Sequence, residues 1–420
     1  MMFGLLAFFL VVNHSSLSAQ SGWTVLSSGV SQNLNAVQFL NPDTGFAAGD
    51  AGVLLRTLDG GNTWSALPLP LSMNLSAVHF FSMDSGLVTG PAGQILRTSD
   101  GGSNWSLVPT GITDNLLDVA FFNDSGICGA SSQSIIYSAD AGRSWSIAQS
   151  GFFGGGFNGM CMLSPQIGML GGENSIFQPL AGFTQNGGAS WSFSTFYLSS
   201  NEGNIRDIEF TDVNIGYAAC RVWNGQGAIA RTGDGGANWS SQLFPAPFYG
   251  IDFPISNASL IGFAVGENGA IYKTVDAGGS WLPQQSTVSA RLNDVHFLDP
   301  DWGYAVGNGG TILKTTSGGE PPTHLQQEGQ SAATFQLLGN YPNPFNPATT
   351  IGYRLGRQSE LVLTIYDVQG RTVAVLRPGV QAAGEHALVW NAQSSAASGI
   401  YYYRLNAGTE QAVGKMVLLR

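Results

Sequence analysis

The sequence predicts an all-β protein, in which a seven-bladed β-propeller is followed by a smaller, immunoglobulin-like β-sandwich. Three observations support this prediction. The pattern Ser/Thr-x-Asp-x-Gly-x-x-Trp occurs at residues 57–64 and returns five times with small changes. Its tryptophans, with Trp23 before the first motif, recur every 40 to 48 residues up to Trp281, a self-similarity typical of propellers. The motif stops after residue 319, and strand-like segments in a new pattern follow.

A single repeat, residues 64–104, is predicted to contain four short strands. A strand starts at each motif Trp, residues 75–80 alternate as a strand does, and residues 87–89 and 94–98 form two more between Gly-containing turns. Four antiparallel strands in about 40 residues match the size of a propeller blade. The last repeat lacks its Trp strand, and residues 23–26 can supply it. We therefore expect the first and last strands to share one blade, which removes the open edge.

The repeated Asp is predicted to hold a tight turn, because its carboxylate can accept hydrogen bonds from backbone N–H groups a few residues on. The Trp is expected to fill the space between blades. We therefore predict structural roles for these positions, which are Asp59, Trp64, Asp100, Trp105, Asp140, Trp145, Asn186 (in place of Asp), Trp191, Asp234, Trp239, Asp276 and Trp281.

The eight-residue motif resembles the Asp box, or BNR repeat, of sialidases and sortilin-type receptors. The longer pattern Gly-Phe/Tyr-Ala-x-Gly…Gly-x-Ile-Leu-Lys/Arg-Thr-x-Asp-Gly-Gly-x-x-Trp is similar to that of the photosystem II stability/assembly factor family, and it recurs from residue 23 to residue 319. This resemblance implies a seven-bladed propeller. Members of that family act on thylakoid complexes, and the resemblance of the propeller repeats alone does not transfer that role to this chain.

Charge is scarce and unevenly distributed. Charged residues make up 10% of the chain, and the formal net charge is −11. Residues 331–420 hold seven Lys and Arg against four Asp and Glu, or +3, so residues 1–330 carry −14. An acidic propeller is a poor partner for nucleic acid or for an anionic membrane surface.

The first 19 residues are predicted to be a secretory signal peptide. Residues 3–12 form an apolar segment too short to span a bilayer, and small residues precede a cleavage site after Ala19. The usual positive charge before the apolar segment is missing. No other segment is predicted to cross a membrane.

The three cysteines, Cys128, Cys161 and Cys220, are widely spaced, so we expect buried thiols rather than a disulfide or metal site.

We expect four parts: a signal peptide at residues 1–19, the propeller at 20–319, a polar linker at 320–335 and a sandwich at 336–420. The sandwich resembles the type A C-terminal sorting domain of the type IX secretion system. Residues 341–347, 365–371, 398–402 and 415–420 carry the resemblance as a set. Taken alone, the Pro-Asn-Pro-Phe-Asn-Pro run within the first of these segments also resembles the immunoglobulin-like modules of flagellar hook-capping proteins. The sorting-motif residues are Tyr341, Pro342, Asn343, Pro344, Phe345, Lys415 and Arg420. The resemblance implies passage through the periplasm and then release or attachment at the outer cell surface, with the secretion machinery as partner. An accessory sandwich without a sorting role is the alternative.

Aromatic side chains gather in the long loops of repeats four to six, on the face opposite the Asp turns. We predict that they bind a glycan or protein ligand, since amphipathic rings with a few charges suit such recognition. The alternative is that they fill the ends of the blade core. The candidates are Phe152, Phe153, Phe157, Tyr197, Arg206, Trp223 and Tyr249.

Acidic and histidine side chains also lie on the predicted inner strands, where they could line the axis. They are Asp118, Asp207, Glu209, Asp252, Asp294, His79 and His296. Paired carboxylates raise the possibility of a glycosidase, which needs two of them at a defined separation. A water-lined channel or a bound cation is the simpler interpretation. The arginine and Tyr–Glu pattern of a sialidase is absent, as are serine-hydrolase, zinc-protease and phosphate-loop motifs.

These observations predict an exported, non-enzymatic binding or scaffold propeller, with no catalytic residue, metal or cofactor. The alternative is an extracellular glycan hydrolase of sialidase-like type, or the accessory module of one.

Overall fold

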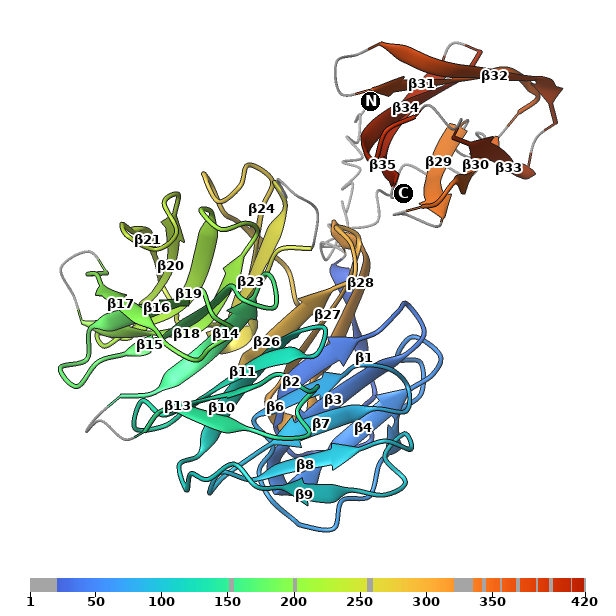
Figure 1. The fold of residues 1–420 in the computed structure, drawn as a ribbon. Coiled ribbons are helices and arrows are strands. Elements are labelled where there is room, and N and C mark those ends of the chain that lie inside the picture. Colours follow the sequence, from blue (N-terminus) through green and yellow to red (C-terminus); the bar gives the residue numbers. More distant parts are fainter. Residues whose placement is uncertain are drawn as a thin grey trace, which may run out of the picture. The chain divides into compact units, whose positions relative to one another are not determined.

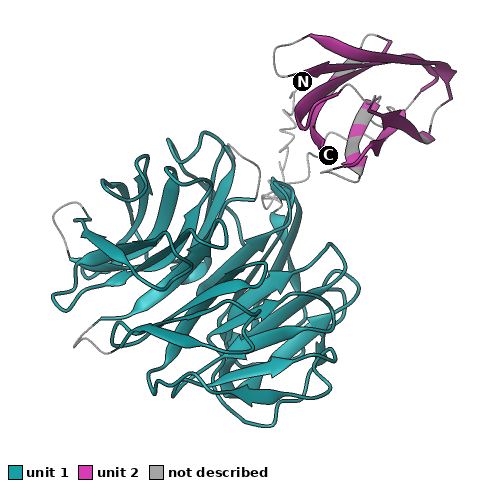
Figure 2. Cartoon of the chain, in the orientation of Figure 1, with its two compact units in different colours: residues 1–322 teal, residues 323–420 magenta. Residues whose placement is uncertain are grey.

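The computed structural model describes residues 21–150, 155–198, 202–254, 260–320, 335–341, 345–355, 357–367, 371–382, 384–392, 396–408 and 410–418. The chain divides into two compact units, residues 1–322 and 323–420, shown in teal and magenta in Figure 2. The predicted signal peptide lies outside the described residues. Among the residues described, no helix has the length and apolar character needed to cross a membrane.

The first unit is a ring of seven four-stranded antiparallel sheets, so the predicted propeller is confirmed (Figure 1). Each sheet is one blade, and its strands are named A to D from the axis outward. Blade 1 contains β2 (Leu34–Phe39), β3 (Gly45–Gly49), β4 (Leu54–Thr57) and β5 (Ser65–Ala66), and blade 2 contains β6 (Ala77–Phe80), β7 (Gly86–Thr89), β8 (Ile95–Thr98) and β9 (Ser106–Val108). Blade 3 contains β10 (Leu116–Phe122), β11 (Ser125–Ala130), β12 (Ile135–Ser138) and β13 (Ser146–Gln149).

The remaining blades follow in chain order. Blade 4 contains β14 (Phe157–Met162), β15 (Gly168–Glu173), β16 (Pro179–Thr184) and β17 (Ser192–Thr195), and blade 5 contains β18 (Gly203–Phe210), β19 (Gly216–Val222), β20 (Gly227–Thr232) and β21 (Ser240–Phe244). Blade 6 contains β22 (Phe248–Asp252), β23 (Gly262–Gly266), β24 (Ile271–Thr274) and β25 (Leu282–Gln284). Blade 7 contains β26 (Leu292–Phe297), β27 (Trp302–Gly307), β28 (Ile312–Gly319) and β1 (Gly22–Leu26).

The ring closes as the sequence predicts. Strand β1, from the start of the described chain, pairs antiparallel with β28 and forms the outer strand of blade 7 (Figure 1). Trp23 is 2% exposed and packs edge-on against Phe263 and Phe297. The last strand is therefore contributed by the other end of the unit, and blade 7 has its fourth strand.

Aromatic stacking joins neighbouring blades. Tyr304 of blade 7 stacks on Phe39 of blade 1, with ring centroids 3.5 Å apart, and Trp64 meets Phe39 edge-on at 6.0 Å. The Phe39 ring covers Gly45, at which an added Cβ would lie 2.5 Å from ring atoms. The repeated Gly before an aromatic residue is explained by this close approach, which a side chain would block.

The second unit is a β-sandwich of two antiparallel sheets. One sheet contains β29 (Phe335–Tyr341), β30 (Ala348–Leu355) and β33 (Gly384–Asn391); the other contains β31 (Ser359–Asp367), β32 (Thr372–Gln381), β34 (Gly399–Ala407) and β35 (Glu410–Leu418). Phe345 is 2% exposed in the core between the sheets and contacts Trp390 at a centroid distance of 5.4 Å. Tyr341 ends β29, and Lys415 lies in β35. Pro342, Asn343, Pro344 and Arg420 lie outside the described residues.

Candidate functional site

The Asp motifs hold their turns through side-chain hydrogen bonds. The Asp59 Oδ1 atom accepts from the Thr57 hydroxyl and from the Thr63 N–H, both at 2.8 Å, and Oδ2 accepts from the Thr63 hydroxyl at 2.6 Å. The bonds from Thr63 hold the pKa of Asp59 below its usual value. In the fourth copy, Asn186 keeps the Oδ1 contacts and donates from Nδ2 to the Ser190 hydroxyl. Substitution of Asp by Asn thus preserves the turn.

These turns lie on one face of the propeller. The Gly60 N–H donates to the Asp43 carbonyl in the turn between β2 and β3, so the C–D turns share an edge of the blade with the A–B turns. The B–C and D–A loops end at the opposite edge, because the strands are antiparallel. Any site built from the longer loops is therefore on the face away from the Asp motifs.

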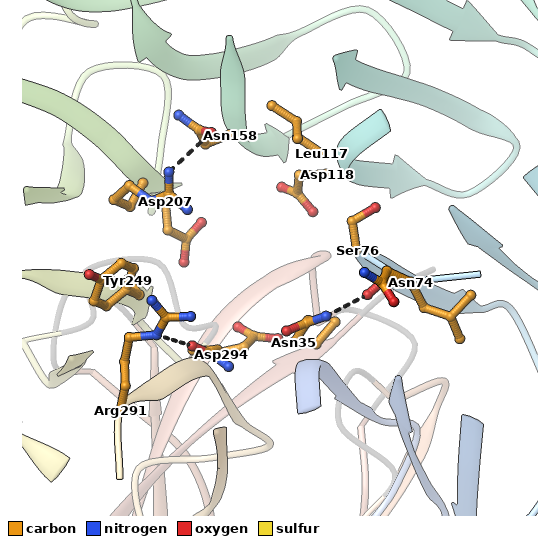
Figure 3. Close-up of a pocket in the computed structure, with 14 residues that line it drawn as sticks. Asn35, Asn74, Ser76, Leu117, Asp118, Asn158, Asp207, Tyr249, Arg291 and Asp294 are labelled. Atoms are coloured by element: carbon orange, nitrogen blue, oxygen red, sulfur yellow. Dashed lines mark hydrogen bonds between the residues drawn. The ribbon is translucent and has the colours of Figure 1, made fainter. Parts of the chain in front are cut away.

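A pocket of about 280 Å³ opens at the axis on that second face (Figure 3). Each of the seven inner strands, or the residue just before it, contributes one side chain at the same repeat position. These residues are Asn35, Ser76, Leu117, Asn158, Arg206, Tyr249 and Asn293. The next position along the strand carries Asp118, Asp207 and Asp294 in blades 3, 5 and 7, and all three line the pocket.

The three aspartates connect consecutive blades. Each accepts a backbone N–H from the inner strand of the next blade: Asp118 from Met160 at 2.7 Å, Asp207 from Ile251 at 2.8 Å and Asp294 from Val37 at 2.7 Å. The next blade has only Gly or Ala at the matching position, namely Gly159, Gly250 and Ala36. An added Cβ at Gly159 would lie 2.6 Å from the Asp207 Cα atom, so these small residues allow the inner strands to meet.

A second row lies deeper along the axis, two positions further on each inner strand. Asp252 accepts the Phe297 N–H, and Gln38 accepts the Phe80 N–H at 2.6 Å. The His296 Nε2 atom lies 3.2 Å from the Phe39 carbonyl oxygen. These contacts again join one blade to the next. The predicted inner-strand acids and His296 therefore lie around the axis and form hydrogen bonds between blades, whereas His79 packs against the rings of Phe81 and Phe121.

Burial sets the charge of the acids around the axis. Desolvation raises the pKa of Asp118 to about 8, that of Asp252 to about 7 and that of Asp207 to about 6. Burial also raises the pKa values of Asp294 and Glu209 well above their ordinary range. Near neutral pH the floor of the pocket therefore carries less negative charge than its count of carboxyl groups suggests.

Two guanidinium groups flank an aromatic ring at the pocket wall. The Arg206 and Arg291 Cζ atoms lie 5.5 Å and 4.7 Å from the centre of the Tyr249 ring, within the range of cation–π contacts. Arg291 Nε donates to the Asn293 side chain at 2.8 Å, and an Arg206 Nη atom lies 3.5 Å from the Asn158 side-chain oxygen (Figure 3). Arg206 Nε is buried without a hydrogen-bond partner among the described residues. The pocket wall thus holds two guanidinium groups in place, and Arg206 Nε can still donate a hydrogen bond to a ligand.

The structure places the predicted binding residues in different surroundings. Arg206 and Tyr249 line the axial pocket. Tyr197 and Trp223 are 64% and 42% exposed and belong to the loops of blades 4 and 5 on the same face. Phe152 and Phe153 lie outside the described residues.

The prediction for Phe157 as a binding residue is wrong. Phe157 is the first residue of the inner strand of blade 4. Its side chain is 0% exposed, belongs to a core cluster between blades and stacks on Phe193. The repeat could have shown this, because Phe157 occupies the position that Leu34 and Leu116 fill in other blades, where both are buried. For this residue the alternative interpretation, an aromatic that fills the end of the core, is correct.

Sequence reasoning missed two further groups of residues. Arg291 joins the pocket with the amides Asn35, Asn158 and Asn293. Phe177, in the B–C connection of blade 4, is 49% exposed and contacts Trp223 edge-on at 5.6 Å. Alignment of the inner strands by repeat position would have indicated the amides. Among the described residues, no group of three or more His, Cys, Asp and Glu side chains is placed to hold a metal ion.

Comparison with known proteins confirms both resemblances. Residues 15–112 match the family model described as photosynthesis system II assembly factor YCF48. A curated relative, the photosystem II assembly lipoprotein Ycf48 of Synechococcus sp. (strain CC9902), is 25% identical over 182 residues, which cover 43% of this chain and 51% of the relative. The chain thus spans about half the length of the curated relative it matches. Residues 340–419 match the family model of a secretion system C-terminal sorting domain, which implies export to the cell surface or secretion.

Solved structures show the same propeller fold. YCF48 bound to a D1 peptide has a TM-score of 0.57 at 20% identity, over 70% of this chain and 97% of that one. YCF48 from Cyanidioschyzon merolae has a TM-score of 0.56, also at 20% identity, with coverage of 70% and 98%. A GH74 xyloglucanase from Xanthomonas campestris has a TM-score of 0.57 at 11% identity, over 93% of this chain and 75% of the enzyme. At these identities the likeness concerns the fold alone.

Proposed function

We propose that this chain is an exported, non-enzymatic recognition protein whose propeller binds an extended peptide segment of another protein at the axial pocket. The observation that carries the proposal is the pocket wall, where Arg206 and Arg291 flank Tyr249 beside the amides of Asn158 and Asn293. Guanidinium and amide groups bind the carbonyl and carboxylate oxygens of a peptide, and a fixed ring packs against its apolar parts. The solved YCF48 structure that contains a D1 peptide supports a peptide as the ligand class.

The charges of the pocket favour an acidic segment. The wall has two guanidinium groups, and burial raises the pKa values of Asp118 and Asp294 on the floor, so much of the floor's negative charge is absent near neutral pH. The rest of the propeller is acidic, and this should discourage acidic ligands elsewhere on its surface. The two guanidinium groups should therefore direct an acidic segment to the axial pocket rather than to other parts of the propeller surface.

The engagement of the carboxyl groups argues against a hydrolase. A glycoside hydrolase needs two carboxyl groups that face the scissile bond, one able to give a proton and the other to act as a base or nucleophile. Asp118, Asp207 and Asp294 instead each accept a backbone N–H from the next blade. The GH74 likeness, at 11% identity, supplies no catalytic residue.

The proposal is tested by peptide selection on the full chain. An immobilised library of random linear peptides, divided into acidic, neutral and basic sublibraries, is probed with the protein and with Arg291→Gln. We expect enrichment of acidic peptides and at least about tenfold weaker binding in the variant, since loss of a desolvated charge pair costs more than the free energy of one decade in affinity.

The matched control is Arg143→Gln, which removes an exposed arginine on the face of the Asp motifs. It should bind the selected peptides like the unmodified chain. Equal binding by Arg291→Gln, or selection of basic peptides, would overturn the proposal. Release of reducing sugar from polysaccharides by the same preparation would favour the hydrolase instead.

A further inference from the structure

The B–C connections of blades 4 and 5 differ from those of the other blades. In blades 1, 6 and 7 the connection is a short 3₁₀ turn: η1 (Asp50–Gly52), η2 (Glu267–Gly269) and η3 (Asn308–Gly310). The middle residue of each has positive φ and is small or polar, as Ala51 and Asn268 are. The connection of blade 4 instead presents Ile176 and Phe177, and that of blade 5 presents Trp223. Large apolar side chains thus occupy the B–C connections of blades 4 and 5, whereas other blades form the same connection with small or polar residues.

These apolar groups lie in the same loop region as Tyr197, which follows the outer strand of blade 4 and accepts a hydrogen bond from Gln178, the residue after Phe177. The four side chains are 60%, 49%, 42% and 64% exposed for Ile176, Phe177, Trp223 and Tyr197. We call them the blade 4–5 platform. The Phe177 and Trp223 rings meet edge-on at 5.6 Å, and the Arg221 guanidinium lies 4.9 Å from the Trp223 ring centre. Contiguous exposed rings of this kind mark an interaction site rather than chance exposure.

Backbone hydrogen bonds fix the loops of the platform to each other. The Gly203 N–H donates to the Phe177 carbonyl at 2.9 Å, and the Trp223 N–H donates to the Glu202 carbonyl at 3.1 Å. Phe177 has a φ of 61°, a left-handed backbone that favours Gly, and the Asn174 side chain accepts the neighbouring Ile176 and Gln178 N–H groups. The B–C turns of other blades share this positive φ, as at Ala51 and Asn268; in blade 4 a bulky apolar residue occupies the position at an exposed tip.

Amide and hydroxyl groups lie along one edge of the platform, and the Arg221 guanidinium, which interacts with Glu173, lies against Trp223. Asn174 Nδ2 donates to Gln178 Oε1 at 3.0 Å, and Gln178 Nε2 donates to the Tyr197 hydroxyl at 2.8 Å. The Tyr197 hydroxyl accepts in that contact, so its proton is available to a ligand. Beside Trp223, Asn224 donates to Gln226 at 2.7 Å. The exposed aromatic rings are therefore edged by oriented amide and hydroxyl groups.

This combination fits a neutral sugar chain best. A pyranose ring with equatorial substituents has an apolar C–H face, which packs on an aromatic ring, and a rim of hydroxyl groups, which pair with amides and tyrosine hydroxyls. An anionic membrane surface would require a cluster of Lys and Arg, whereas the propeller region carries a formal −14 and the platform has Arg221 alone, stacked on Trp223. A globular protein partner would need a much larger contact area than four side chains offer.

We propose that the blade 4–5 platform binds a neutral, β-linked oligosaccharide, with Trp223 and Phe177 as the stacking surface and Tyr197 as a hydroxyl donor. The site is separate from the axial pocket and does not depend on peptide binding there. The chain would then hold a glycan at the rim of the same face on which it recognises a protein.

The test is calorimetric titration of the full chain with cellohexaose and xylohexaose, and with polygalacturonate as an anionic comparison. We expect at least one neutral hexaose to bind. Trp223→Ala should weaken that binding by about tenfold or more, because stacking on an exposed ring contributes roughly the free energy of one decade in affinity. Tyr197→Phe keeps the ring and removes only the hydroxyl, so it should weaken binding severalfold without affecting folding.

Two controls keep the outcomes distinct. Phe122→Ala removes a phenyl ring of similar exposure, 38%, at the A–B turn on the opposite face and should bind like the unmodified chain. Arg291→Gln should lose acidic peptides while it retains the hexaose. The proposal fails if no neutral hexaose binds at millimolar concentration, if polygalacturonate alone binds, or if Trp223→Ala binds the hexaose normally. Capture of a protein by the platform without any hexaose binding would also overturn it.

Discussion

The Asp294 carboxylate of blade 7 accepts the backbone N–H of Val37 of blade 1 at 2.7 Å, across the seam where the propeller closes and 257 positions away in the chain. Further contacts cross the same seam. Tyr304 stacks on Phe39, Lys314 Nζ donates to the Gly60 carbonyl at 2.7 Å, and Asn293 donates to the Leu34 carbonyl. The seam therefore has side-chain bonds from the axis to the outer edge in addition to the shared strand β1.

Asp294→Ala should weaken this closure. It removes the acceptor for two buried N–H groups, those of Val37 and Val295, and an unsatisfied buried donor costs about 1–3 kcal/mol. We expect the free energy of unfolding of the propeller to fall by about 2–4 kcal/mol, measured by urea titration with tryptophan fluorescence. Nine of the ten tryptophans lie before residue 323, so the signal reports this unit. Asp124→Ala, at an exposed A–B turn, is the matched control and should shift the midpoint little; equal shifts in both variants would show that the seam bond is unimportant.

The buried acids should make the propeller less stable as pH rises. The pKa values of Asp207, Asp252 and Asp118 are raised by burial to about 6, about 7 and about 8, so the folded state binds more protons than the unfolded state. Stability from a raised acid pKa is full below the unfolded value and is lost as pH rises through the folded value, here from about pH 4 to about pH 8. His79, whose pKa burial lowers to about 4, acts in the opposite sense, but only below its unfolded value of about 6.5.

The interval from pH 6.5 to pH 8 therefore reports mainly the acids, because the buried thiols of Cys128, Cys161 and Cys220, whose pKa values are also raised, contribute only as the unfolded thiols ionise above about pH 8. Across it, we expect the free energy of unfolding to fall by at least about 2 kcal/mol, through Asp118 and Asp252 together with Asp294 and Glu209, whose pKa values burial raises well above their ordinary range. Urea midpoints at fixed ionic strength measure this change. Asp118→Asn should flatten the slope, because the group no longer titrates. A midpoint that is constant or rises with pH would contradict the assignment of these carboxyl groups to the buried axis.

Asn186 provides a natural comparison for the Asp motif. It keeps the Oδ1 bonds of Asp59 and replaces one accepted bond by a donated one. We therefore expect Asp59→Asn to retain most of the thermal stability, whereas Asp59→Ala should lower the Tm by a few degrees, because it removes the three hydrogen bonds that the Asp59 carboxylate accepts from Thr57 and Thr63. Differential scanning calorimetry of the two variants distinguishes them. Similar losses in both would mean that the carboxylate charge, rather than the turn geometry, matters.

The repeat made the fold predictable from the sequence. The spacing of Trp64, Trp105 and Trp145 predicted the blades, and the missing Trp strand predicted the closure by residues 23–26. The axial pocket was harder to predict, because its side chains come from seven separate strands and converge only through the curvature of the ring. Arg291 and Asn158 are 133 positions apart in the chain, and no local pattern connects them.

The loops were predicted only in part, for a physical reason. An aromatic residue near a strand end has the same sequence signature whether it caps the core or projects into solvent. Phe157 and Tyr197 both follow Gly- or Ser-containing loops, yet one is fully buried and the other is 64% exposed. Repeat position decides between them, since Phe157 aligns with the buried first residue of each inner strand, while Tyr197 lies in a D–A connection whose sequence differs from blade to blade.

Substitution of these two aromatics should therefore have opposite consequences. Phe157→Ala opens a cavity where Met160, Ile127 and Phe193 meet the ring, and it should lower the free energy of unfolding by about 3–5 kcal/mol. Tyr197→Ala removes a mostly exposed ring and should change it by about 0.5 kcal/mol or less. Urea titration measures both. If Phe157→Ala were as stable as the unmodified chain, the inner strand of blade 4 would not be packed as described, and the original interpretation of Phe157 as a surface residue would return.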